Sequence, residues 1–194
     1  YQTANNSRIH RKQMKEDSDY IKSTEYALKH NMESIISSSE IDKTVKELTR
    51  KIDEDFKEWS NITIVCVLKG AYWFMSDIGK YTNLNWNIEF LKASSYSGTT
   101  STGTLTFDLF PNKQYIENHH ILIVEDCVDS CLTLNKIYSQ IKRMNPDSVH
   151  IATMIDKSGL SASEKVSAIG MDVKYIAFTT SHHDFLIGRG LDWD

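Results

Sequence analysis

The sequence predicts a single α/β domain in which helices cover both sides of a mostly parallel, twisted sheet. Short, nearly continuous apolar runs are typical of strands that are buried on both faces. Helical patterns stand between several of these runs, and only two prolines interrupt the chain. Strands that alternate with helices form crossover units, and such units give parallel sheets.

The expected elements follow one another from Ile41 onward. Apolar residues at three- and four-residue steps from Ile41 to Phe56 predict an amphipathic helix. Further helical patterns cover residues 72–81 and 132–144. The predicted strands are residues 62–68, 88–91, 121–124, 149–155 and 173–178. Ligands of such sheets bind beyond the carboxyl ends of the strands, so a site is expected in the loops that follow them.

Composition separates the first residues from the rest and excludes several classes of protein. Residues 1–39 are polar with mixed charges, which predicts a helical extension or docking arm before a domain at residues 40–194. The 22 basic and 26 acidic residues give no sign of a nucleic-acid partner. No apolar run approaches the ~20 residues of a membrane span. Three cysteines without a disulfide or zinc spacing indicate an intracellular, reducing compartment.

The most informative segment is residues 121–134, ILIVEDCVDSCLTL. The predicted strand ends in two acids, Glu125 and Asp126, whose carboxylates can accept hydrogen bonds from the vicinal hydroxyls of a sugar. The turn that follows carries Asp129, Ser130 and Thr133. The start of the next helix offers free backbone N–H groups to a phosphate. The segment therefore predicts a pocket for a ribose 5-phosphate.

Two other interpretations of this segment stay open. The acids can simply cap the strand while Ser130 caps the helix. A bacterial receiver domain also has paired acids at a strand end, but there they follow the opening strand, whereas two apolar strands and a helix come first here.

Together with further motifs, the segment resembles the hypoxanthine-guanine branch of the type I phosphoribosyltransferase family. The resemblance covers about residues 35–194 and implies the type I fold with a flexible lid loop. VLKGA resembles the family's pyrophosphate loop, SSYSGTTSTG its lid, and DKSG and DFLIGRGLDWD its purine-binding segments. The shared order of these motifs along the chain carries the resemblance.

The resemblance implies a role for individual residues. Lys69 and Gly70 would bind pyrophosphate, with a cis bond between Leu68 and Lys69, and the lid residues Ser95 and Tyr96 would close over the reacting centre. The implied purine contacts are Lys157, Phe185 and Leu186. The implied ribose and 5-phosphate contacts are Glu125, Asp126, Ser130 and Thr133, with Asp129 as proton acceptor. The implied Mg²⁺ acids are Asp192, Glu125 and Asp126.

The implied reaction is purine salvage, in which phosphoribosyl pyrophosphate and hypoxanthine or guanine give a nucleoside monophosphate and pyrophosphate. The implied partners are a purine base with phosphoribosyl pyrophosphate, or a purine nucleotide. A homo-oligomer, or a larger complex joined through residues 1–39, is also implied. The resemblance favours the cytoplasm, and the mitochondrial matrix stays open because the chain begins at Tyr1.

The sequence departs from the family at the phosphate loop. Cys131 stands where the family has glycine, and Leu132 where a polar or basic residue is common. A side chain at the glycine position adds bulk and, in a left-handed conformation, costs roughly 1–2 kcal/mol. The family also continues beyond the point that matches Asp194, through a strand and an arginine that helps to hold pyrophosphate. The alternative is therefore a catalytically inactive subunit with a structural or nucleotide-binding role.

Overall fold

The computed structural model of this 194-residue chain describes residues 35–95, 105–170, 173–180 and 186–191. The chain divides into two units, Tyr1–Ile41 and Asp42–Asp194. Nearly all of the predicted N-terminal arm lies outside the described residues. None of the described helices is both long enough and apolar enough to cross a membrane.

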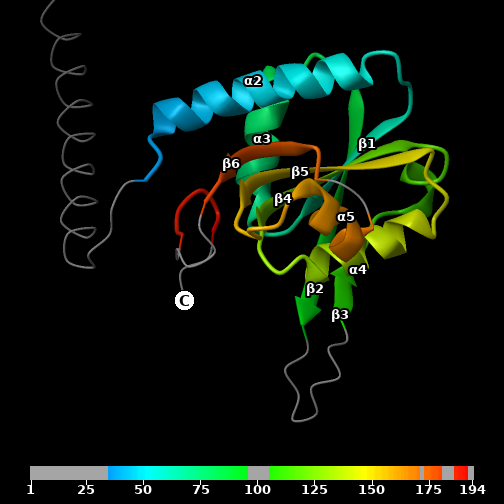
Figure 1. Cartoon of the computed structure of the whole chain (residues 1–194). Helices are drawn as coiled ribbons and strands as arrows, with labels where there is room; N and C mark the ends of the chain where they lie inside the picture. Colours follow the sequence, from blue (N-terminus) through cyan, green and yellow to red (C-terminus); the bar gives the residue numbers. More distant parts are fainter. Residues whose placement is uncertain (1–34, 96–104, 171–172, 181–185, 192–194) are drawn as a thin grey trace, which may run out of the picture. The chain divides into compact units, whose positions relative to one another are not determined.

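The second unit is built on a six-stranded sheet with the strand order β3-β2-β1-β4-β5-β6 (Figure 1). The strands are β1 (Ile62–Val67), β2 (Trp86–Ser95), β3 (Leu105–Leu109), β4 (His120–Val128), β5 (Ser148–Asp156) and β6 (Tyr175–Thr179). Strands β2, β1, β4, β5 and β6 pair in parallel, and β3 pairs antiparallel with β2. The predicted mostly parallel sheet is confirmed.

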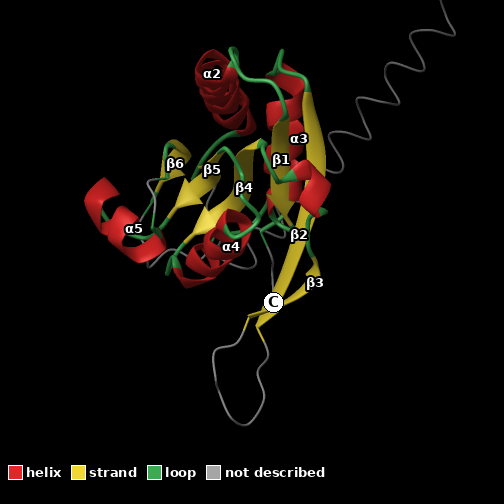
Figure 2. Ribbon diagram, turned by 90° about the vertical axis from the view of Figure 1, so that its right-hand side faces the viewer, coloured by secondary structure: helices red, strands yellow, loops and turns green. Residues whose placement is uncertain are grey.

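Helices cover both faces of the sheet (Figure 2). Helices α2 (Ser38–Phe56) and α3 (Ala71–Tyr81) lie on one face, and α4 (Leu132–Lys142) and α5 (Ala162–Ile169) lie on the other. A short 3-10 helix, η1 (Lys113–Tyr115), precedes β4. The three predicted helices correspond to α2, α3 and α4, although α4 ends two residues earlier than expected, at Lys142.

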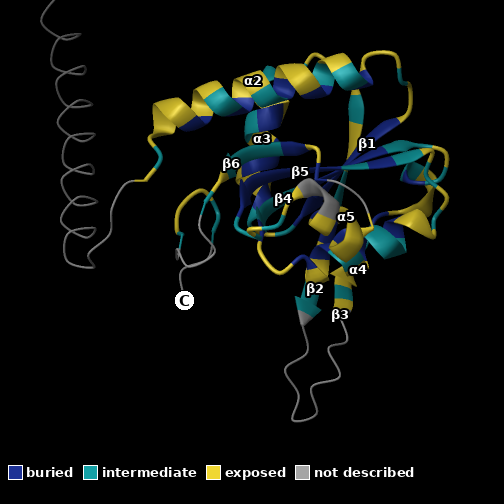
Figure 3. Ribbon diagram, in the orientation of Figure 1, coloured by how far each residue is buried: buried dark blue, intermediate teal, exposed yellow. Residues whose placement is uncertain are grey.

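The core consists of the sheet and the helix faces that touch it (Figure 3). Every residue of β1 is buried. The apolar stretch of β4 before the acids is also buried. Helix α2 adds Val45, Ile52 and Phe56, which have no exposed surface. Since parallel strands covered on both faces need apolar side chains on both, the near-continuous apolar runs of the sequence were an accurate guide to these strands.

Several elements differ from the predicted ones. Strand β4 continues past Val124 to Val128, so Glu125 and Asp126 lie within the strand rather than after it. The reason is that β5 pairs with β4 over the same stretch, with Glu125 opposite Thr153. The sequence also missed β3 and α5. Helix α5 is only eight residues long and begins at a capping box, so its apolar repeat is too short to stand out.

Candidate active site

Most of the predicted site residues that the structure describes lie at the end of β4 or in the loops that follow β1, β4 and β5. Strand β4 lies between β1 and β5 and is parallel to both, so the carboxyl ends of the three strands meet at one edge of the sheet. Lys69 follows β1, Asp129 follows β4 and Lys157 follows β5. The fold therefore brings together three loops that are separated by more than two dozen residues each along the chain.

Some of the predicted residues cannot be placed at this edge. Tyr96, Phe185 and Asp192 lie outside the described residues. Ser95 is the last residue of β2, and only its backbone is described. Leu186 is described and half-buried, and it begins the loop at residues 186–191.

The two acids of β4 form a coupled pair. Glu125 Oε1 accepts a hydrogen bond from the backbone N–H of Asp126 at 3.2 Å, and Asp126 Oδ1 accepts one from the backbone N–H of Cys127 at 2.7 Å. Burial, together with the hydrogen bond and negative charge of Asp126, raises the pKa of Glu125 well above its usual range. Two adjacent carboxyl groups at this edge suit two neighbouring hydroxyls of a sugar.

The loop after β1 lies directly against this acid pair. The peptide bond between Leu68 and Lys69 is cis, as the sequence resemblance implies. A Cβ atom added to Gly70 would lie 1.5 Å from Asp126 Oδ2, which is far inside contact distance. A side chain at this position would displace the loop or the Asp126 side chain, so the main chain of the loop lies against the carboxylate of Asp126.

The turn between β4 and α4 has the left-handed conformation that normally calls for glycine. Cys131 has φ 62° and ψ −9° at the N-cap of α4. The first backbone bond of the helix runs from the Asn135 N–H to the Cys131 carbonyl at 2.9 Å, so the preceding N–H groups have no acceptor within the helix. Such groups at a helix start are an anion site.

The side chains of Cys131 and Leu132 in this turn lie in different environments. Cys131 is 4% exposed and belongs to the buried apolar cluster of the core, while Leu132 is 68% exposed. The bulk of the cysteine therefore lies in the interior. Burial, and then the charge of Asp156, raises the pKa of the Cys131 thiol. The thiol stays neutral near pH 7 and adds no negative charge beside an anion.

Lys157 lies on a loop whose backbone is hydrogen-bonded both to the end of β4 and to the last residue of β5. Its N–H donates to the Val128 carbonyl at 2.7 Å, which ties the loop to the end of β4. The next residue, Ser158, donates its N–H and its hydroxyl to Asp156 Oδ1 at 3.0 and 2.6 Å. Asp156 Oδ2 also lies 2.6 Å from the Lys165 ammonium. The loop is thus built on a buried carboxylate that sequence reasoning had not singled out.

A family model described as "Phosphoribosyl transferase domain" matches residues 31–183 of this chain. The chain belongs to the phosphoribosyltransferase domain family. The type I phosphoribosyltransferase fold predicted from the sequence is confirmed.

Relatives of this chain among curated proteins align with most of its length. The "Hypoxanthine-guanine phosphoribosyltransferase" of Dictyostelium discoideum is 35% identical over 165 residues, which are 83% of this chain and 87% of the relative. The "Hypoxanthine phosphoribosyltransferase" of Escherichia coli strain K12 is 32% identical over 167 residues, covering 86% of this chain and 90% of the relative.

Solved structures agree with the fold of this phosphoribosyltransferase. A hypoxanthine phosphoribosyltransferase from Staphylococcus aureus superposes with a TM-score of 0.71 at 28% identity, covering 83% of this chain and 84% of that one. A point mutant of the Trypanosoma cruzi enzyme, described as a ternary substrates complex, gives a TM-score of 0.70 at 29% identity and covers 82% and 87%.

The buried ion pair between Lys165 and Asp156, next to the Lys157 loop, was not predicted from the sequence of this phosphoribosyltransferase. The side chains of Lys165 and Asp156 are only 7% and 4% exposed. Burial by itself would raise the pKa of Asp156, but hydrogen bonds from Lys165 and Ser158 outweigh it and lower that pKa. Lys165 belongs to α5, the helix that was missed, and no local pattern relates it to Asp156.

Histidines near the opposite, amino-terminal edge of the sheet have structural partners. The His120 ring stacks on Trp59 with 4.1 Å between ring centroids. His120 Nδ1 and His150 Nε2 lie 2.9 and 3.1 Å from the same hydroxyl oxygen, that of Ser148. Within the described ranges, no group of three His, Cys, Asp or Glu side chains is arranged to hold a metal ion.

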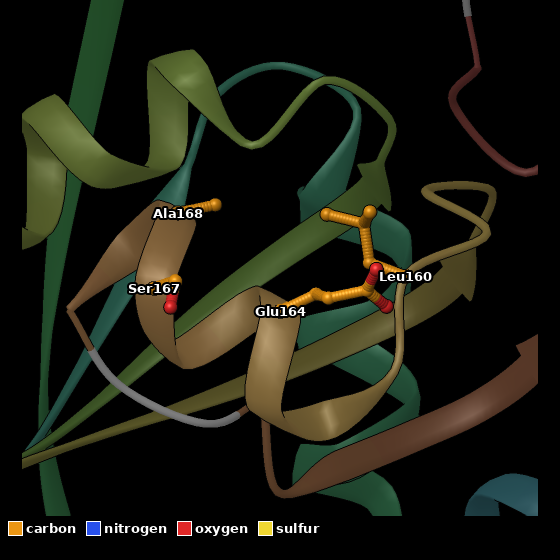
Figure 4. Close-up of a pocket in the computed structure, with 4 residues that line it drawn as sticks. All are labelled: Leu160, Glu164, Ser167 and Ala168. Carbon is orange, nitrogen blue, oxygen red and sulfur yellow. The ribbon is translucent and has the colours of Figure 1, made fainter.

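A shallow cavity on the surface of this phosphoribosyltransferase lies apart from the predicted site residues. Its volume is about 440 Å³, and it is lined by Leu160, Glu164, Ser167 and Ala168 (Figure 4). The Glu164 carboxylate is already engaged by the backbone N–H and the hydroxyl of Ser161, at 2.8 and 2.7 Å. The cavity is therefore a depression beside the start of α5, and none of the predicted site residues lines it.

Proposed function

We propose that this chain catalyses purine salvage, the transfer of a phosphoribosyl group from phosphoribosyl pyrophosphate to hypoxanthine or guanine. The observation that carries the proposal is the meeting, at one sheet edge, of the acid pair, the Gly70 backbone and the left-handed start of α4. Curated relatives with hypoxanthine and hypoxanthine-guanine phosphoribosyltransferase names support it. None of the described residues favours the inactive-subunit alternative.

The reaction breaks the bond from the anomeric carbon of the ribose to the pyrophosphate oxygen and joins that carbon to a purine nitrogen. In our proposal Glu125 and Asp126 bind the ribose hydroxyls, while backbone N–H groups at the start of α4 hold the 5-phosphate together with the Ser130 and Thr133 hydroxyls. Asp129 takes the proton that leaves the purine ring.

The remaining contacts surround the leaving group and the base. Lys69 and the Gly70 backbone bind pyrophosphate, and Ser95 and Tyr96 close over the reacting centre to exclude water. We assign the purine contacts to Lys157, Phe185 and Leu186. A cationic donor at Lys157 pairs with a 6-oxo group and would be left unpaired by a 6-amino group, which favours hypoxanthine and guanine over adenine.

Magnesium fits the chemistry of this edge. Mg²⁺ prefers carboxylate oxygens and usually binds through one or two of them together with substrate phosphates. Glu125 and Asp126 supply such oxygens, and we propose that they hold the ion with Asp192. When bound, it neutralises charge on the departing pyrophosphate.

We also propose that residues 1–39 act as a docking arm for a homo-oligomer or a larger complex. Their polar, mixed-charge composition supports this assignment. All three cysteines are free, which supports a reducing, intracellular compartment.

The function is tested by supplying phosphoribosyl pyrophosphate, Mg²⁺ and hypoxanthine, guanine or adenine and measuring the nucleotide that forms. We expect product from the two 6-oxopurines. Lys157→Met should lower kcat/KM for hypoxanthine by roughly 10- to 100-fold, because a hydrogen bond from a charged donor contributes about 1.5–3 kcal/mol. Lys174→Met is the matched control, because Lys174 directly precedes β6 and is paired with Asp55 of α2. No product from any base at saturating donor would refute the proposed function.

Cys131→Gly tests whether the altered turn obstructs the 5-phosphate. Loss of the buried thiol is expected to lower the free energy of unfolding by about 1–2 kcal/mol. Glycine removes the strain of the left-handed conformation, which should raise it by about the same amount. The free energy of unfolding of the variant should therefore lie within about 1 kcal/mol of the wild-type value. Its kcat/KM should stay within about fivefold of the wild type. Activity that rises far beyond this range would mean that the sulfur blocks the phosphate site, contrary to its buried position.

A further inference from the structure

The loop after β6 packs against helix α3 at a glycine. Gly190 has φ 92°, and a Cβ atom added to it would lie 2.6 Å from the Gly70 carbonyl oxygen and 2.9 Å from Trp73 Cδ1. The Gly190 backbone therefore touches the loop after β1 and the first turn of α3. Glycine alone combines this backbone conformation with so close an approach.

The turn that presents Gly190 is left-handed over three successive residues. The φ angles of Gly188, Arg189 and Gly190 are 100°, 50° and 92°. The Leu191 N–H closes the turn by donating to the Gly188 carbonyl at 3.0 Å. Arginine seldom adopts positive φ, so Arg189 needs contacts that hold it in this conformation.

An ion pair supplies such a contact. Arg189 Nη1 lies 2.7 Å from Asp77 Oδ2, and the two side chains are 36% and 22% exposed. Asp77 belongs to α3, the same helix that carries Trp73. The loop is thus fastened to one rigid element at two points, by packing at Gly190 and by charge at Arg189.

We propose that the Arg189–Asp77 ion pair is a latch that positions the purine loop, residues 186–191, against the pyrophosphate loop. This inference rests on the proposed function, in which Leu186 contacts the purine while Lys69 and Gly70 bind pyrophosphate. Arg189 and Asp77 are positioning residues that act through the loop. A loop that is already fastened loses less conformational entropy when the purine binds, so the latch lowers the KM for the purine.

Arg189→Asn is the most informative variant, because asparagine adopts the left-handed conformation more readily than arginine, so the ion pair is removed without added backbone strain. Asp77→Asn removes the negative charge of the other partner without changing the loop. The charge-swapped double variant, Asp77→Arg with Arg189→Asp, restores the pair in reverse. Each variant is made in the full chain, with purine KM, donor KM, thermal midpoint and amide hydrogen exchange of residues 186–191 as the measurements.

We expect both single variants to exchange the amides of residues 186–191 faster than the wild type. The KM for hypoxanthine should rise about three- to fivefold, the range of a partly exposed ion pair. The donor KM and the thermal midpoint should not change, and the double variant should return the purine KM to within about twofold of the wild type. A purely structural role would instead shift the thermal midpoint and leave the purine KM unchanged.

Each other outcome refutes a distinct statement. Unchanged hydrogen exchange in Arg189→Asn would overturn the latch itself. Faster exchange with an unchanged hypoxanthine KM would overturn its positioning role. A wild-type chain without turnover would refute the proposed function and with it the kinetic role, while hydrogen exchange would still decide whether the latch exists.

Discussion

Gly70→Ala is expected to lower kcat/KM for phosphoribosyl transfer by roughly 100-fold or more while the chain stays folded, because a displacement of about 1 Å in the groups that position the substrate costs about that much. The added methyl group would lie 1.5 Å from Asp126 Oδ2, so either the loop after β1 or the carboxylate has to move. Both belong to the proposed site. Steady-state kinetics with hypoxanthine and phosphoribosyl pyrophosphate would measure the loss.

Gly79→Ala is the matched control for this prediction. It makes the same substitution within α3, where nothing lies within 4 Å of the added Cβ. Since alanine is the better helix former, this variant should be stabilised by up to about 1 kcal/mol and keep full activity. A Gly70→Ala protein as active as Gly79→Ala would show that the approach of Gly70 to Asp126 is not needed for catalysis.

Lys165→Met is expected to lower the free energy of unfolding by about 3–5 kcal/mol near neutral pH, because it leaves the buried Asp156 carboxylate without its partner. Lys165 Nζ lies 2.6 Å from Asp156 Oδ2, and both side chains are almost inaccessible to water. Urea unfolding would measure the loss. Lys174→Met removes a lysine whose pair with Asp55 is 44% and 31% exposed, and should cost no more than about 1 kcal/mol.

The loss caused by Lys165→Met should depend on pH. A carboxyl with a lowered pKa in the folded chain stabilises above its unfolded value, here near 3.8, and loses that contribution as the pH falls through the folded value. In the variant, protonation of Asp156 also removes the unpaired buried charge. The difference between wild type and variant should therefore be largest near pH 7 and shrink as the pH falls toward and below 3.8. A difference that does not vary with pH would contradict the assignment of the loss to Asp156.

The parts of the fold that the sequence predicted well are those with a local cause. Strand β1 is buried at each of its six positions, so its apolar run marks it directly. Helix α2 shows its buried stripe in the spacing of its apolar residues. Strand β3 lacks such a mark, because it is a short edge strand whose place depends on antiparallel pairing with β2. For the same reason the end of β4 was misjudged, since pairing with β5 extends the strand through its acids.

At the site, motifs indicated which loops meet, but not the contacts between distant residues. Asp156 and Lys165 pair across a loop, and Arg189 pairs with Asp77, 112 residues earlier in the chain. Neither pair has a local pattern that would announce it. The direction of the Cys131 side chain could not be predicted either, because it follows from the core beneath the turn.

The buried cysteine of the turn between β4 and α4 bears on how members of this family are detected. A sequence pattern that demands glycine at this place would pass over the chain, although φ is 62° at Cys131. Here a sulfur anchored among apolar neighbours accompanies a left-handed residue at the start of α4. Searches that compare the path of the main chain, rather than its signature letters, should therefore recover further transferases whose motif has drifted.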